Sequence, residues 1–259
     1  MQPADNCARK CSEGITMIYL GKSDIGKVRK MNQDAFIVKQ EDKMTLAFVC
    51  DGMGGAKAGE VASRMACEKI VEYTDTHPLD AQPDVQHWLH DAVAYANEAV
   101  YSASMRTPAY YGMGTTLVGL LEYDDHLYSV NVGDSRLYGF KPSLFEQITL
   151  DHSLVSEMVS RGMISEEESK NHPKRHILTN ALGISRDIRI DIEEVLTSYD
   201  LLLISSDGLH SMLEDDQIQA ILSTEADLPT LCDHLIDAAN QAGGNDNITV
   251  ILAQTEGKL

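Results

Sequence analysis

Apolar and polar residues alternate along a series of short runs in this chain, as they do in β-strands that pack one face on a core. The runs with this pattern are 15–20, 35–39, 44–50, 115–123, 126–132, 136–140, 144–149, 190–196, 201–205 and 248–253. Short polar links such as Asp124-Asp125 separate many of these runs. Links of that length join neighbouring strands in hairpins, so the pattern predicts a largely antiparallel sheet.

A second pattern, with apolar residues every three or four positions, predicts amphipathic helices at 58–73 and 85–101. Two more helices are expected at 215–222 and 228–242, and Gly243-Gly244 is a C-terminal stop signal for the second. Strands and helices of these lengths together indicate a mixed α/β protein, with helices covering an antiparallel sheet.

One domain is expected from residue 14 to residue 255, after a polar N-terminal tail at 1–13. Between residues 153 and 182 the pattern changes to short helical pieces and a basic run that contains Lys174 and Arg175. This segment is too short for a separate domain and carries apolar residues that must cover something, so we interpret it as a surface flap. Its basic run is either a substrate contact or a solvated face.

The charge balance narrows the classes of partner. The chain of 259 residues has 40 Asp+Glu against 21 Lys+Arg, a formal net charge of -19. A surface this acidic repels phosphate backbones and anionic lipids, so neither a nucleic-acid partner nor a membrane partner is expected. No apolar stretch has the length of a membrane helix or signal peptide, which predicts a cytoplasmic location. An acidic protein that handles phosphate needs a local positive centre, either arginines or bound metal ions.

Cysteine usage fits a reducing compartment, because the five cysteines are an odd number spread thinly along the chain. We expect free thiols. Cys7 and Cys11 form a C-x3-C pair in the tail, but no second Cys or His pair accompanies them. They are therefore interpreted as tail thiols, with a metal or redox pair as the alternative.

Candidate chemistry lies at the ends of predicted strands. The aspartates at these ends are Asp34, Asp51, Asp134, Asp207 and Asp246. Asp-Gly is a common hairpin turn, but Asp51 and Asp207 are followed by Gly and then by a helical stretch instead of a strand. Carboxylates gathered at one end of a core repel one another unless a divalent cation compensates, and Mg2+ and Mn2+ prefer oxygen ligands. Whether these strand ends are neighbours is left open by spacing alone.

A set of short motifs occurs in one order along nearly the whole chain. The motifs are VRKMNQD at 28–34, DGMGG with GE and AS at 51–63, GMGTT at 112–116, NVGDSR at 131–136, TLDHS at 149–153, SSDGL at 205–209 and GGNDNITV at 243–250. This ordered set resembles the bacterial branch of the metal-dependent serine/threonine phosphatases, the protein phosphatase 2C or PPM family. The resemblance implies a central antiparallel β-sandwich flanked by helices on both sides, a four-layer α-β-β-α fold, with a two-metal site at one end.

The resemblance also implies roles for individual aspartates. Asp51 is expected to bridge two metal ions, the Gly52 carbonyl to bind one of them, and Asp207 and Asp246 to complete the other. Asp134 is the expected ligand of a third, weaker ion. The implied cofactors are therefore two Mn2+ or Mg2+ ions, with a possible third site.

Other residues are expected to support the reaction. Arg29 matches the arginine that grips the substrate phosphate, and its planar fork suits two phosphate oxygens. Asp34 is expected to support a metal-bound water. Asn247 and Thr249 either fix Asp246 in place or act as turn formers.

Two positions depart from the pattern of eukaryotic members. Gln33 stands where they often have Glu, which removes a carboxylate near the metals. Met53 stands where they have His, and a thioether cannot protonate a leaving alkoxide. Metal-bound water is the expected proton source, and His152 and His210 are poorer candidates.

The activity implied by the resemblance is hydrolysis of phosphoserine and phosphothreonine in proteins by metal-activated water, without a covalent intermediate. The expected catalytic set is Arg29, Asp51, Asp207 and Asp246. The expected partners are phosphorylated Ser/Thr proteins and a cognate Ser/Thr kinase. The alternatives are a non-catalytic relative that binds a partner, and a phosphatase of small phosphate esters or of a regulatory partner in a sigma-factor switch.

Overall fold

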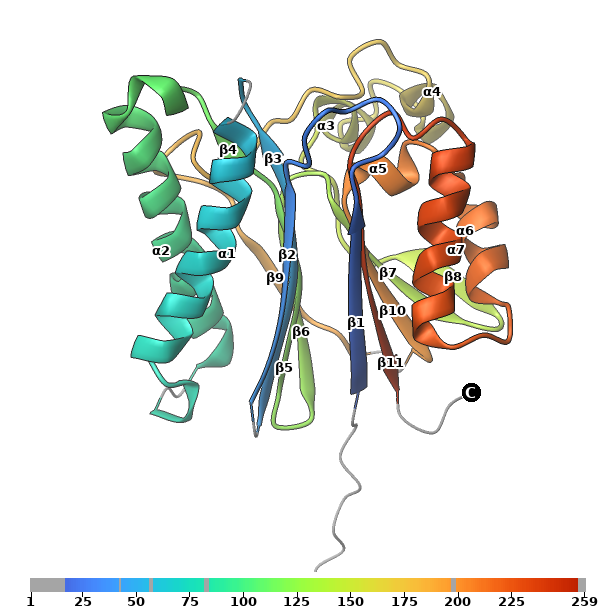
Figure 1. Cartoon of the computed structure of the whole chain (residues 1–259), viewed down its shortest axis with the longest axis horizontal. Helices are drawn as coiled ribbons and strands as arrows, with labels where there is room; N and C mark the ends of the chain where they lie inside the picture. The colour runs from blue at the N-terminus through green and yellow to red at the C-terminus, as the bar shows by residue number, and fades with distance from the viewer. Residues whose placement is uncertain (1–16, 42, 56–57, 82–83, 197–198, 256–259) are drawn as a thin grey trace, which may run out of the picture.

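Two antiparallel sheets stack face to face, and helices cover both outer faces, in the computed structural model of this chain (Figure 1). The structure describes residues 17–41, 43–55, 58–81, 84–196 and 199–255. The predicted tail at 1–13, with Cys7 and Cys11, lies outside these ranges. The four-layer α-β-β-α arrangement confirms the predicted fold class.

The first sheet has the order β1-β11-β10-β7-β8. Its strands are β1 (Met17–Asp24), β11 (Ile248–Thr255), β10 (Leu201–Ser205), β7 (Arg136–Lys141) and β8 (Leu144–Gln147). The second sheet has the order β2-β3-β5-β6-β9, with β4 paired to β3 off this path. Its strands are β2 (Asp34–Glu41), β3 (Met44–Met53), β4 (Gly114–Thr115), β5 (Leu117–Tyr123), β6 (His126–Val132) and β9 (Asp191–Glu194).

The strand predicted at 115–123 is wrong in one respect, because Thr116 divides it into β4 and β5. Thr116 lies opposite Asp51 and keeps one ladder bond, because its N–H donates to the Asp51 carbonyl at 2.9 Å. The Asp51 N–H, however, donates to the Thr116 hydroxyl at 2.9 Å instead of to a backbone carbonyl. The run predicted at 144–149 also ends early, at Gln147. There the Thr149 hydroxyl accepts the Leu137 N–H at 3.1 Å, so a side chain replaces a backbone partner.

Helices of the N-terminal half cover the second sheet, and helices of the C-terminal third cover the first (Figure 1). The longer helices are α1 (Ala58–Thr76), α2 (Val85–Arg106), α6 (Asp215–Leu222) and α7 (Leu228–Gln241), and the short ones are η1 (Leu79–Ala81), η2 (Pro108–Tyr110) and α5 (Asp207–His210). Gly243 and Gly244, with φ of 148° and 57°, follow the end of α7, as predicted.

The core has three layers, and β3 shows how one strand serves two of them. Leu46 and Phe48 pack against α1 and α2, whereas Ala47 and Val49 pack against the other sheet. Because side chains alternate across a strand, a strand buried on both faces needs an unbroken apolar run. Each such Leu or Phe contributes about 1.5–3 kcal/mol by leaving water.

The flap segment, with α3 (Leu154–Ser160) and α4 (Glu166–Lys170), lies at the same end of the sandwich as the loop between β1 and β2 (Figure 1). Its two ends meet at its base. The Leu154 N–H donates to the Ile177 carbonyl at 2.8 Å, and the Thr179 N–H donates to the His152 carbonyl at 2.9 Å.

Two further expectations can be compared with the described residues. Cys50, Cys67 and Cys232 are buried free thiols, as predicted. In the described ranges, no helix combines the length and the apolar character that a membrane crossing requires.

Candidate active site

Strand direction brings the predicted aspartates together. Because the paired strands are antiparallel, β3 and β6 end, and β2 begins, at the same end of the second sheet. Asp34 is in register with Asp51 across β2 and β3. In the first sheet, β10 ends just before Asp207 and its partner β11 begins just after Asp246. Strand pairing therefore places Asp34 and Asp51 together in the second sheet, and Asp207 and Asp246 together in the first.

The two sets of strand ends face a common cavity of about 740 Å³. The predicted site residues on its wall are Arg29, Asp51, Gly52, Asp134, Asp207, Asp246 and Asn247. Two of the residues expected to support the reaction, Thr249 and Asp34, are not on this wall. Asp34 sits behind Asp51, where its Oδ2 atom accepts hydrogen bonds from the hydroxyls of Ser206 at 2.7 Å and Thr249 at 2.6 Å.

The carboxylates resist ionisation in this arrangement. Burial and the charge of neighbouring carboxylates raise the pKa of Asp51 well above its usual value. Burial raises the pKa of Asp34 and of Asp134 to about 7, although two hydroxyl hydrogen bonds oppose the shift at Asp34. The pKa of Asp207 is raised by burial and by the charge of Asp246. Shifts of this kind mark a group of like charges that lacks a counter-charge.

Gly52 is required by close packing at the end of β3. A Cβ atom there would lie 2.1 Å from the carbonyl oxygen of Gly59, at the start of α1. The Gly52 N–H donates to the Gln33 carbonyl at 3.1 Å, so the β1–β2 loop is bonded to this position. Gln33 lines the cavity at the position where the resemblance led us to note a missing carboxylate.

Arg29 projects from the β1–β2 loop and pairs with Asp246, with 2.6 Å between the guanidinium Nη2 and Oδ2. About half of its side chain is exposed. The loop rests on the α7–β11 connection, because the Gly244 carbonyl accepts the Lys27 N–H at 2.8 Å and the Val28 N–H at 3.2 Å. Arg29 and Asp246 therefore belong to one bonded unit.

Asn247 is bonded both to Asp246 and to the β1–β2 loop that carries Arg29, and the sequence did not indicate the bonds to that loop. Its backbone N–H donates to Asp246 Oδ1 at 2.8 Å. Its side chain accepts the Gln33 N–H at 2.8 Å and donates to the carbonyls of Ile25 at 2.9 Å and Met31 at 3.0 Å. The Asn247 amide thus fixes both ends of the loop that carries Arg29. Only the spatial neighbourhood of two distant loops reveals this.

The flap also reaches the cavity. Arg175, His176 and Leu178 lie on its wall, whereas Lys174 does not. His176 and Thr116 are cavity residues that the sequence analysis missed, although the GMGTT motif was a signal for Thr116. His152 and His210, the poorer proton-donor candidates, are not on this wall. Burial lowers the pKa of His210 well below its usual value.

The donor set can be compared with what a divalent ion requires. Among the described residues, no group of three or more His, Cys, Asp or Glu side chains stands ready to hold a metal ion. Arg29 occupies one oxygen of Asp246. The Asp207 Oδ1 atom is nevertheless buried without a hydrogen-bond partner, beside carboxylates whose pKa values are raised. An all-oxygen donor set with unmet negative charge fits Mn2+ or Mg2+.

Comparison with solved structures identifies the class of protein that this fold and cavity define. The crystal structure of the serine/threonine phosphatase Stp1 from Staphylococcus aureus matches with a TM-score of 0.88 and 35% identity, covering 94% of this chain and 97% of that one. The catalytic domain of the serine/threonine protein phosphatase PstP, in complex with two manganese ions, matches with a TM-score of 0.77 and 31% identity, covering 92% and 97%. The class is that of the bacterial serine/threonine phosphatases.

Sequence comparison places the chain in a family. The family model described as protein phosphatase 2C matches residues 21–253. The serine/threonine phosphatase Stp of Listeria innocua is 36% identical over 236 residues, which are 90% of this chain and 94% of that protein. The chain belongs to the protein phosphatase 2C family and is a serine/threonine protein phosphatase. The resemblance noted in the motifs is thereby confirmed.

Proposed function

We propose that this phosphatase hydrolyses phosphoserine and phosphothreonine in proteins by a metal-assisted mechanism in the acidic cavity. The observation that carries the proposal is the convergence of Asp51, Asp207 and Asp246 on one cavity wall, with Arg29 beside them. The raised pKa values of Asp51 and Asp207, with the Arg29 guanidinium nearby, suit a site that first binds cations and then phosphate.

Asp51, the Gly52 carbonyl, Asp207 and Asp246 would hold two divalent ions, and Asp134 would hold a third, weaker one. The manganese in the PstP structure supports this choice of metal. Bound Mn2+ or Mg2+ supplies a water of lowered pKa as nucleophile and neutralises charge on the phosphoryl oxygens.

Arg29 binds and orients the phosphoryl group through its planar fork of N–H donors. In the structure the fork donates to Asp246, so engaging a phosphate means exchanging one acidic partner for another. Asn247 keeps Arg29 and Asp246 within reach of each other during that exchange, because it is bonded to both loops.

Asp34 supports the attacking water from behind Asp51. The Ser206 and Thr249 hydroxyls hold its Oδ2 atom, so the carboxylate is fixed in position. Met53 lies on the cavity wall and has no proton to give, so a metal-bound water would protonate the leaving alkoxide, as expected from the sequence.

The flap contributes to substrate binding. Arg175 and His176 lie on the cavity wall, which favours a substrate contact over a solvated face for this part of the basic run. A phosphorylated protein offers a chain on either side of its phosphate, and the flap is placed to meet it. The resemblance further suggests a cognate Ser/Thr kinase whose phosphorylation this phosphatase reverses, and the pattern of apolar residues in the sequence suggests a cytoplasmic location.

The test is hydrolysis of a phosphothreonine peptide and of a small aryl phosphate by the purified protein, with Mn2+, with Mg2+ and with excess chelator. We expect turnover only with metal, and loss of turnover in Asp51→Asn. Turnover in chelator, or full activity of Asp51→Asn at saturating metal, would overturn the metal assignment. A large preference for the aryl phosphate would move the substrate class to small phosphate esters.

A further inference from the structure

His152 is a buried residue at the base of the flap, and the proposed mechanism does not use it. It is 3% exposed and lies at the point where the flap leaves the sandwich. Its backbone N–H donates to the Gly133 carbonyl at 2.8 Å. Its side chain returns the contact, because Nδ1 accepts the Gly133 N–H at 3.2 Å. His152 is therefore bonded twice to the residue that precedes Asp134.

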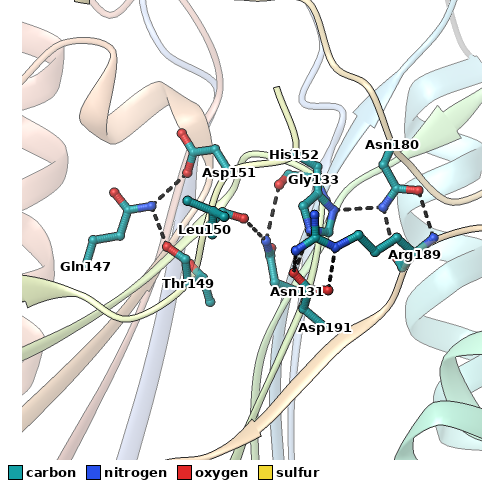
Figure 2. Close-up of polar contacts among 10 residues, drawn as sticks. All are labelled: Asn131, Gly133, Gln147, Thr149, Leu150, Asp151, His152, Asn180, Arg189 and Asp191. Carbon is teal, nitrogen blue, oxygen red and sulfur yellow. Dashed lines mark hydrogen bonds and ion pairs between the residues drawn. The ribbon is translucent and has the colours of Figure 1, made fainter. Parts of the chain in front are cut away.

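The same imidazole is bonded to the other end of the flap (Figure 2). Nδ1 also accepts from the Asn180 amide at 2.8 Å. Since Nδ1 accepts both N–H groups, Nε2 carries the ring proton and donates it to Asp191 Oδ2 at 3.0 Å. One ring thus joins the Asp134 turn, the returning end of the flap and strand β9.

The partners of His152 are themselves held firmly. Asp191 on β9 accepts hydrogen bonds from both Nε and Nη2 of Arg189 (Figure 2). Asn180 accepts the Arg189 N–H at 3.2 Å and donates to the Arg189 carbonyl at 2.8 Å. With its amide oriented by these two bonds, Asn180 presents its N–H to the imidazole in a fixed direction.

The turn that carries Asp134 is in direct contact with residues of the cavity wall. Gly133 has φ of 118°, and a Cβ there would lie 2.6 Å from Thr116, so the turn packs directly on Thr116. Thr116 in turn bonds to the Asp51 main chain and to the Ser135 hydroxyl. Beside the imidazole lies a cavity of about 200 Å³, lined by His152, by residues of α3 and by Arg189, so the packing between flap and sandwich is incomplete there.

We propose that His152 is a positioning residue that couples the flap to the turn carrying Asp134. Through this coupling, the placement of the flap governs how a protein substrate, in contrast to a small phosphate ester, meets the cavity. The effect on protein substrates rests on the proposed function. The coupling between the flap and the Asp134 turn can be measured in the protein without metal or substrate.

Two variants and a matched control test the coupling. His152→Gln keeps an N–H for Asp191 but removes the ring nitrogen that Gly133 and Asn180 share. Asn180→Ala removes the flap partner of the ring, together with the two Asn180 bonds to the Arg189 backbone, and leaves the buried ring in place. The control is His126→Gln, which breaks an exposed pair with Glu194, 2.7 Å long, on the same two strands β6 and β9.

Hydrogen–deuterium exchange of the metal-free protein is the first readout. We expect amides at 133–136 and at 177–180 to exchange about five- to tenfold faster in both variants, as loss of a buried hydrogen bond implies, and to be unchanged in the control. Faster exchange at 177–180 alone in Asn180→Ala would overturn the coupling. If His152→Gln does not fold, Asn180→Ala decides the matter by itself.

Kinetics on two substrates is the second readout. We expect kcat/KM for a phosphothreonine peptide to fall about tenfold in both variants and that for an aryl phosphate to fall less than about threefold. Equal losses on both substrates would overturn the role in substrate choice. A wild-type protein that hydrolyses neither substrate would instead refute the proposed function, and the exchange result would still decide the coupling.

Discussion

The two ends of the sandwich carry the same residue type and do different things with it. At one end, Asp124 and Asp125 join β5 to β6 in an exposed hairpin with φ of 50° and 67°. At the other, Asp51 lies near the end of β3, Asp207 comes just after β10, and both face a shared cavity. Both pairs terminate apolar strands, so the local pattern is similar.

The difference lies in what comes next along the chain and across the sheet. After Asp125 the chain reverses into the neighbouring strand, and both carboxylates remain in water. After Asp51 and Asp207 the chain enters helices, which pack on the sheet and leave the carboxylates facing other strand ends. Buried carboxylates that lie close together raise one another's pKa, and this supports the proposal of a cation site at the second end.

The largest effect is expected when the same substitution, Asp→Asn, is made at the cavity end and at the hairpin end of the sandwich. Asp207→Asn should lower kcat/KM on a phosphothreonine peptide about 10³-fold or more at saturating Mn2+, because a neutral amide is a poor ligand for a divalent ion. Asp124→Asn should leave kcat/KM within about twofold. Similar losses at the two positions would refute the distinction between the ends.

A second test uses pH in the metal-free protein. Burial raises the pKa of Asp34 and of Asp134 to about 7 in the folded state, so these groups bind protons more tightly folded than unfolded. Folding stability should therefore fall as pH rises from about 4 through about 7, on the order of 3 kcal/mol between about pH 5 and pH 7.5.

Urea unfolding at the two pH values, with and without Mn2+, measures this effect. Saturating Mn2+ should recover much of the loss, since an ion that binds only the folded state stabilises it. Metal-free protein that becomes more stable over the same pH interval would show that the carboxylates at this end are not held as described.

A third, smaller effect concerns the Arg29 guanidinium in the acidic cavity. Arg29→Lys keeps the charge but loses the planar fork, so KM for the phosphopeptide should rise about tenfold with kcat less affected. Lys30→Arg, on the same exposed loop, is the matched control and should leave KM unchanged. A KM for Arg29→Lys equal to that of the wild type would remove Arg29 from phosphate binding.

The smallest effect is expected at the hairpin. Asp125 has φ of 67°, a conformation that glycine adopts without strain, so Asp125→Gly should raise the free energy of unfolding by about 0.5–1 kcal/mol. Phosphatase activity should not change. Thermal or urea unfolding measures the gain, and a loss of activity would mean that the two ends are coupled.

Strands and helices with a clear period were predictable from sequence. The runs at 126–132, 201–205 and 215–222 coincide with β6, β10 and α6. The predictions were less accurate where a side chain replaces a backbone partner, as Thr116 does at the β4–β5 break and Thr149 does after β8. Helix α2 continues to Arg106, past the predicted end at 101, since its last turns pack on neighbours that the local pattern does not show.

The site was predictable as a set of residues but not as a set of contacts. The ordered motifs pointed to Asp51, Asp207 and Asp246, and all three lie on the cavity wall. Asn247 was expected either to fix Asp246 or to act as a turn former; its main chain bonds to Asp246, and its side chain also holds the Arg29 loop. Hydrogen bonds between segments more than two hundred positions apart leave no local signal.

Residue order thus settled the periodicity of the elements, the acidic character of the chain and the family to which it belongs, because each is written in composition or in short contiguous motifs. Which aspartates share a cavity, which one sits behind the others, and which histidine joins the flap to the sandwich were decided by antiparallel pairing and packing. Those contacts depend on distance in space, and the free energy of a charge depends on its burial and its neighbours.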